Sequence, residues 1–165
     1  MPRTLASSAS RSSLAVGTIA DGAARGASPG PNACRSGDYR HVYRQDATRF
    51  ATQRDCTAYA AAGGRPAQFK LAVSEIELDG TDRFFTPAIS GFGLQPDSWV
   101  RVTMYTAGGE PAGWYGAGVV DGSVTRAPGE VRVGCGGSGY VVGTAVTAEG
   151  AMITLAPIPT PWCSA

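Results

Sequence analysis

Apolar residues in the C-terminal part of the chain recur at every second position, in short runs that are interrupted by glycine or proline. The clearest run is SWVRVTMYT, residues 98–106, where Val100, Val102 and Met104 alternate with more polar residues. A period of two is that of a β-strand with one buried face. The chain also contains 23 glycines and 11 prolines among 165 residues. This combination favours short strands joined by tight turns over a bundle of helices.

Further runs of this kind follow one another from residue 67 to the C-terminus, with turn signals every ~8–12 residues. The fold class that we predict is therefore mainly β, an immunoglobulin-like β-sandwich over residues 67–165. Pro87 predicts an edge strand, a shift of pattern near Ser74 predicts a bulge, and Asp121-Gly122 predicts a hairpin turn. The expected core residues are Val100, Val102, Val120, Val133, Val142, Ala145 and Ile153.

A short helix is predicted just before this domain, over about residues 52–62. Thr52 is suited to cap its N-terminus, and Gly63-Gly64 is a typical left-handed stop. Cys56, Tyr59 and Ala60 would share one apolar face of the helix. A helix of only ~10 residues is marginally stable by itself. We therefore expect Cys56 to tether the helix to a neighbouring loop.

The four cysteines are Cys34, Cys56, Cys135 and Cys163, and none belongs to a C-x-x-C pair. A structural zinc site is disfavoured because His41 is the only histidine, and no metal is expected. An even number of widely spaced cysteines favours two disulfides in an exported protein. Three pairings are possible, and Cys34–Cys56 with Cys135–Cys163 respects the change in composition near residue 66. Four buried free thiols remain the alternative.

The chain divides into three parts that differ in amino-acid composition. Residues 1–33 are rich in alanine, serine, glycine and proline, which is typical of a disordered tail or a degenerate export signal. Residues 34–66 are expected to form a small helical appendage, and residues 67–165 the β-sandwich. The protein is expected to be secreted or attached to the cell surface. No transmembrane segment is expected, because no apolar run approaches the ~18 residues that a membrane span needs.

Two segments support a resemblance to a family. FATQRDCTAYAAAGG, residues 50–64, resembles a segment of secreted actinobacterial-type proteins, where a phenylalanine precedes a short helix with Cys, Tyr and a Gly-Gly stop. ISGFGLQPDSWVRVTMY, residues 89–105, is similar to the early strands of bacterial immunoglobulin-like modules. The turn DGS and the late pair Val133 and Cys135 extend the likeness over roughly residues 43–163. The resemblance implies a secreted β-sandwich and supplies no catalytic residue.

Several chemistries are disfavoured by the sequence. A net charge of +1 gives no reason to expect a nucleic-acid partner. GCGGSG, residues 134–139, fits a nucleotide-binding glycine pattern, but a strand-like run follows it where that motif needs a helix. His41 lies in a basic segment without a serine nucleophile motif. We expect no cofactor and no enzymatic activity.

Four aromatic residues are the candidate ligand-binding residues: Trp99, Tyr105, Trp114 and Tyr115. We expect these rings to pack beneath residues 34–66, and the alternative is an exposed platform for a glycan or a protein partner. The predicted function is non-enzymatic recognition, adhesion or structural support outside the cell. The alternatives are a small-molecule carrier with an apolar pocket between Trp114 and the sheet, and a small hydrolase in which His41 meets an acid and a nucleophile.

Overall fold

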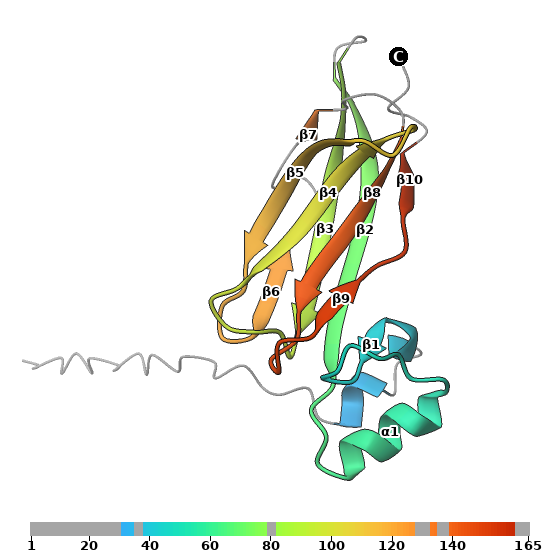
Figure 1. Cartoon of the computed structure of the whole chain (residues 1–165), viewed down its shortest axis with the longest axis vertical. Coiled ribbons are helices and arrows are strands. Elements are labelled where there is room, and N and C mark those ends of the chain that lie inside the picture. Colours follow the sequence, from blue (N-terminus) through green and yellow to red (C-terminus); the bar gives the residue numbers. More distant parts are fainter. Residues whose placement is uncertain (1–30, 35–37, 79–81, 128–132, 135–138, 161–165) are drawn as a thin grey trace, which may run out of the picture.

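The computed structural model describes residues 31–34, 38–78, 82–127, 133–134 and 139–160 (Figure 1). The described chain is mainly β, with two antiparallel five-stranded sheets and a single α-helix. Residues 1–30 of the expected tail over residues 1–33, and the expected bridge between Cys135 and Cys163, lie outside these residues. Residues 31–33 are described and belong to a 3₁₀ turn.

The first sheet has the order β1-β2-β3-β6, and β7 also pairs with β3. The second sheet has the order β10-β8-β4-β5, and β9 also pairs with β8. The first sheet comprises β1 (Val42–Tyr43), β2 (Ala67–Leu78), β3 (Asp82–Phe92), β6 (Ser123–Arg126) and β7 (Val133–Gly134). The second comprises β4 (Trp99–Thr106), β5 (Pro111–Gly118), β8 (Gly139–Val146), β9 (Met152–Thr154) and β10 (Ile158–Thr160). The helices are α1 (Gln53–Ala61) and the short 3₁₀ turns η1 (Pro31–Cys34) and η2 (Asp38–His41).

The two sheets share one hydrophobic core, which lies between them. Phe69 and Phe85 of the first sheet belong to the same buried cluster as Val102 of the second. Gly143 of β8 allows this close approach, because a Cβ atom there would lie 2.9 Å from the ring of Phe69. The prediction of core positions is confirmed for four residues, which are at most 2% exposed: Val100, Val102, Ala145 and Ile153.

Two core predictions are wrong. Val120 is 70% exposed, because it lies in the turn after β5. Val142 is half-buried on the outer face of β8, while its neighbour Val141 is buried. Neighbouring side chains of a strand point to opposite faces, so only one of these two valines can point inward. The sequence alone does not show which of them does. The side chain of Val133 lies outside the described residues.

The expectations for Pro87 and Ser74 are also wrong. β3 is a central strand, paired with β2 on one side and with β6 and β7 on the other. Pro87 is tolerated because it falls between the pairs Ile89↔Arg126 and Phe85↔Val133, where the described ladder on that side is interrupted. The β2–β3 ladder runs through Ser74 without a shift, so there is no bulge there.

The turn at Asp121-Gly122 carries the chain from one sheet to the other. Both residues have positive φ, 50° and 74°, as expected for this dipeptide in a tight turn. The turn follows β5 of the second sheet and precedes β6 of the first. The turn prediction is therefore confirmed, and an isolated antiparallel bridge between Val120 and Ser123 closes the turn. The hairpin ends with this bridge, because β5 and β6 belong to different sheets.

The predicted helix is confirmed as α1. Thr52 caps its N-terminus by accepting a hydrogen bond from the amide of Asp55 at 3.1 Å. At the other end, Gly63 has a φ of 86°, and the amide of Gly64 donates to the carbonyl of Tyr59 at 3.0 Å. The amide of Gly63 also donates to the carbonyl of Ala60, at 3.2 Å. The two bonds at this C-terminal end form a Schellman stop.

The helix packs on a small core of its own. Cys56 is buried with Phe50, Val42 and Cys34, and a disulfide joins Cys34 to Cys56 with their Cα atoms 5.6 Å apart. This is the pairing that the change in composition favoured. It closes a loop of 22 residues across the N-terminal unit, by which we mean residues 38–66 together with Cys34.

Replacing Cys56 by serine is expected to loosen the N-terminal unit before the sheets. In the chain-entropy model, losing a disulfide that closes a loop of this size lowers the free energy of unfolding by about 3 kcal/mol. Hydrogen exchange measured by mass spectrometry should show reduced protection over α1 and retained protection in β4 and β8. An equal loss of protection in α1 and β4 would contradict this expectation and show one cooperative unit.

The N-terminal unit is joined to the ends of both sheets through Gln45, which is 3% exposed. Its amide nitrogen donates to the carbonyl of Arg65 at 2.7 Å and, more weakly, to that of Gly93 at 3.4 Å. Its side-chain oxygen accepts from the amide of Glu149 at 3.2 Å, and its backbone carbonyl accepts from the hydroxyl of Thr147 at 2.6 Å. Gln45 therefore connects the N-terminal unit to the β3–β4 and β8–β9 turns.

Replacing Gln45 by alanine should lower the free energy of unfolding by about 1–3 kcal/mol, because it leaves the carbonyl of Arg65 and the amide of Glu149 at the junction without their partner. The carbonyl of Gly93 keeps the amide of Ala148 as a donor at 3.0 Å. Urea unfolding followed by tryptophan fluorescence measures this change. Gln95→Ala is the matched control, since Gln95 is exposed and should tolerate the substitution. Equal stability of the Gln45→Ala and Gln95→Ala proteins would show that the junction does not depend on this side chain.

The turn that presents Gln45 is shaped by Asp46 and Thr48. The carboxylate of Asp46 accepts hydrogen bonds from the hydroxyl of Thr48 at 2.6 Å and from its amide at 2.9 Å. These two bonds, the hydroxyl first, hold the pKa of Asp46 below its ordinary value.

A lowered pKa in the folded state means that the ionised Asp46 stabilises the turn above its ordinary pKa. This contribution is lost as the pH falls through the lowered value. Thr48→Ala should raise the pKa of Asp46 toward the ordinary value, as measured by ¹³C NMR titration of the carboxyl carbon. An unchanged pKa in that variant would show that Thr48 does not set it.

Candidate functional site

The outer face of the second sheet carries two tryptophans from neighbouring strands. Trp99 begins β4, and Trp114 lies on β5 opposite Thr103. Trp99 and Thr103 point to the same side of β4, because side chains alternate along a strand. Trp99 and Trp114 are therefore on one face, opposite the buried Val100 and Val102.

The two indole rings converge over Gly116. A Cβ atom at this position would lie 3.2 Å from a ring atom of Trp99, 3.4 Å from a ring atom of Trp114 and 3.1 Å from the carbonyl oxygen of Val100. The absence of a side chain at Gly116 therefore leaves room for both rings to lie on the sheet.

Arg101 adds a positive charge to this platform. Its guanidinium carbon lies 4.7 Å from the centroid of the Trp114 ring, within the range of a cation–π contact. Arg101 lies opposite Gly116 on β5 and opposite Thr144 on β8. Its donors are thus held beside the apolar platform. We call Trp99, Arg101, Trp114 and Gly116 the tryptophan platform.

The platform is open to solvent. Trp99 is 65% exposed and Trp114 is 62% exposed. The expectation that residues 34–66 cover these rings is wrong, because Gln45 holds the N-terminal unit at the end of the sheets (Figure 1). For Trp99 and Trp114 the structure has the alternative arrangement, in which the rings are exposed.

Tyr105 extends the aromatic surface along β4. Its ring stacks on that of Tyr140 from β8, with the centroids 5.0 Å apart and an angle of 13° between the planes. Tyr140 was not among the residues proposed from the sequence. The signal was present in YVVGTAV, where Tyr140 and Val142 share the outward side of the pleat, but the pairing with Tyr105 depends on the register of two distant strands.

Tyr115 lies on the other face of β5. It is opposite Val102 and packs against the core between the sheets. Its hydroxyl accepts a hydrogen bond from Arg126 at 2.9 Å, which connects β5 to β6. Tyr115 is therefore separated from the platform by the thickness of the sheet.

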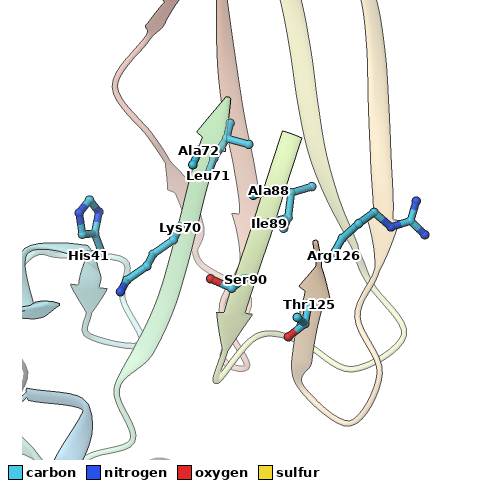
Figure 2. Close-up of a pocket in the computed structure, with 9 residues that line it drawn as sticks. All are labelled: His41, Lys70, Leu71, Ala72, Ala88, Ile89, Ser90, Thr125 and Arg126. Carbon is cyan, nitrogen blue, oxygen red and sulfur yellow. The ribbon is translucent and has the colours of Figure 1, made fainter. Parts of the chain in front are cut away.

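The ring of Trp114 is exposed, so the sheet does not enclose it as an apolar pocket for a carried ligand would. His41 instead lines a hollow of about 390 Å³ on the outer side of β2 and β3 (Figure 2). The hydroxyls of Ser90 and Thr125 also line this hollow, and none of its described lining residues carries a carboxylate. Among the described residues of this hollow, His41 therefore has no acid of the kind that the hydrolase alternative needs.

The described part of the chain has neither a cluster of potential metal ligands nor a membrane-spanning helix. No group of three or more His, Cys, Asp or Glu side chains gathers there in a way that could hold a metal ion. Among the same residues, no helix has the length and apolar character of a membrane span.

No protein-family model, curated protein or solved structure matches this chain.

Proposed function

We propose that this protein is a secreted, non-enzymatic recognition module that binds a glycan on the tryptophan platform. The observation that carries the proposal is the exposure of Trp99 and Trp114, 65% and 62%, on a face where both rings are held against Gly116. Large exposed apolar groups that are adjacent to one another mark interaction sites more often than isolated ones do.

The chemistry of the platform fits a sugar ring. An indole presents a flat apolar face, and the apolar side of a pyranose ring can lie on it. Arg101 supplies several hydrogen-bond donors at the edge of that face, where the ring hydroxyls or a carboxylate of the sugar would lie. The two rings meet over Gly116, so adjacent sugar units could occupy both.

The strand order supports an immunoglobulin-like assignment. β2, β3 and β6 with β7 correspond to strands A, B and E of that fold, and β4, β8 and β9 with β10 correspond to C, F and G. β5 pairs with β4 and adds a fourth strand to the second sheet, as C′ does in variable-type domains. The platform would then lie on the outer face of the C′CFG sheet.

The proposed location outside the cell rests on the disulfide between Cys34 and Cys56. Disulfides persist in oxidising compartments and are rare in the cytosol of most organisms. The proposal of a non-enzymatic role rests on the surroundings of His41, where the lining side chains are basic, apolar or hydroxyl-bearing.

Binding to cellohexaose, chitohexaose and peptidoglycan fragments should be measured by isothermal titration calorimetry on the full chain. At least one of these probes should bind, and Trp99→Ala or Trp114→Ala should weaken it by roughly tenfold or more, as expected for an aromatic anchor. Gly116→Val should weaken the same probe, because the new side chain would displace both rings.

Two control variants separate the platform from general damage. Tyr115→Phe keeps an aromatic ring on the inner face of β5, and Thr125→Ala shortens an exposed side chain of the other sheet. Neither should alter binding. A glycan array on which the wild-type protein binds nothing, or on which both tryptophan variants bind as the wild type does, would refute the glycan proposal. Capture of a protein ligand through the same residues would reassign the platform.

A further inference from the structure

A second cavity, of about 370 Å³, lies where the N-terminal unit meets the edges of the two sheets. Leu71 of β2 and residues 155–158, which lead from β9 to β10, form its apolar wall. Arg40, His41 and Arg49 from the N-terminal unit form its rim. Ligand sites often lie at such junctions between structural units.

The apolar wall is held by the core. A Cβ atom at Gly143 would lie 3.1 Å from a methyl group of Leu71, so Leu71 packs closely against β8. Leu155 is 9% exposed, and its amide donates to the carbonyl of Gly143 at 2.9 Å. The wall is therefore preformed and needs little rearrangement to receive an apolar group.

The residues that the N-terminal unit contributes to the cavity are all basic. The side chain of Arg49 lies over the ring of the buried Tyr43, with its guanidinium carbon 5.6 Å from the ring centroid. Arg40 and His41 end the turn η2 and are exposed. In the part of the chain that the structure describes, Arg40 and Arg49 form no ion pair with a carboxylate. Figure 2 shows His41 beside β2, where it also borders the neighbouring hollow.

We propose that this cavity binds a small amphipathic carboxylate, with its apolar part against Leu71 and Ile158 and its carboxylate between Arg40 and Arg49. The guanidinium group is planar and presents paired donors that match the two oxygens of a carboxylate. The cavity volume is within the lower part of the range found for small-molecule sites. The charged lining residues all come from the N-terminal unit and the apolar ones from β2 and residues 155–158, which favours a ligand with one charged end and an apolar body.

This proposal is independent of the glycan proposal. The cavity is built from β2, the segment between β9 and β10 and the N-terminal unit, and the tryptophan platform is built from β4 and β5. Loss of binding at one site should leave the other unchanged.

Sodium decanoate is the probe, kept below its aggregation limit and added to the full-length, oxidised protein. NMR should show shifts of the Leu71 and Ile158 methyl signals and of the His41 ring signals, with the Trp99 and Trp114 indole signals unchanged. Decanol, which has the same chain length and no charge, should bind more weakly by roughly threefold to tenfold if the guanidinium groups contribute as exposed charge pairs do.

Two variants test the two halves of the cavity. The double variant Arg40→Gln/Arg49→Gln should reduce decanoate affinity to that of decanol, and Ala156→Trp should fill the cavity and abolish the shifts. The controls are Arg54→Gln and Ala61→Trp, which make the same changes at exposed positions of α1. The urea unfolding midpoint of each variant identifies any loss of the fold.

Three outcomes would overturn the proposal. Unchanged decanoate binding in Ala156→Trp would place the ligand elsewhere, and equal affinity for decanoate and decanol would remove the role of the rim. Binding of phosphatidylserine vesicles that depends on Arg40 and Arg49, without any shift by free decanoate, would assign the rim to a membrane surface.

Discussion

The arrangement of the whole molecule depends on one buried amide. Gln45 is almost fully removed from water, and each polar atom of its side chain has a partner in the backbone of another segment. A buried amide is stable only when it is satisfied in this way. The bonds of Gln45, together with the pairing of β1 with β2, therefore specify the position of the N-terminal unit. That position leaves the outer face of the second sheet open. It also creates the cavity between the N-terminal unit, Leu71 and residues 155–158.

The two faces of the second sheet differ in their side chains and in their surroundings. Its inner face, with Val100, Val102 and Ala117, packs against the first sheet. Its outer face carries two tryptophans, an arginine and a tyrosine pair, which add nothing to that core. Because the pleat separates the two sets, substitutions on the outer face can alter recognition with little effect on the fold.

The sequence predicted those features that depend on contacts between residues close together in the chain. Thr52 and the Gly63-Gly64 pair predicted the ends of α1, because caps and stops are made within a few residues of the helix. Alternation predicted the inner face of β4. The sequence could not show that Trp99 and Trp114 meet over Gly116, which requires the register between two strands. Gln45 reads as an ordinary loop residue, since its partners lie far away in the chain.

Gln45 and its partners in the β8–β9 turn lie far apart in the chain, and this distance limits when their bonds can form during synthesis. The bonds of Gln45 to Thr147 and Glu149 span 102 and 104 residues. The N-terminal unit therefore leaves the ribosome before the residues that will hold it exist. Its own bridge spans only 22 residues, from Cys34 to Cys56, and needs nothing from the sheets. The N-terminal unit can thus close its own bridge early, while its bonds to the β8–β9 turn can form only after most of the chain has been made.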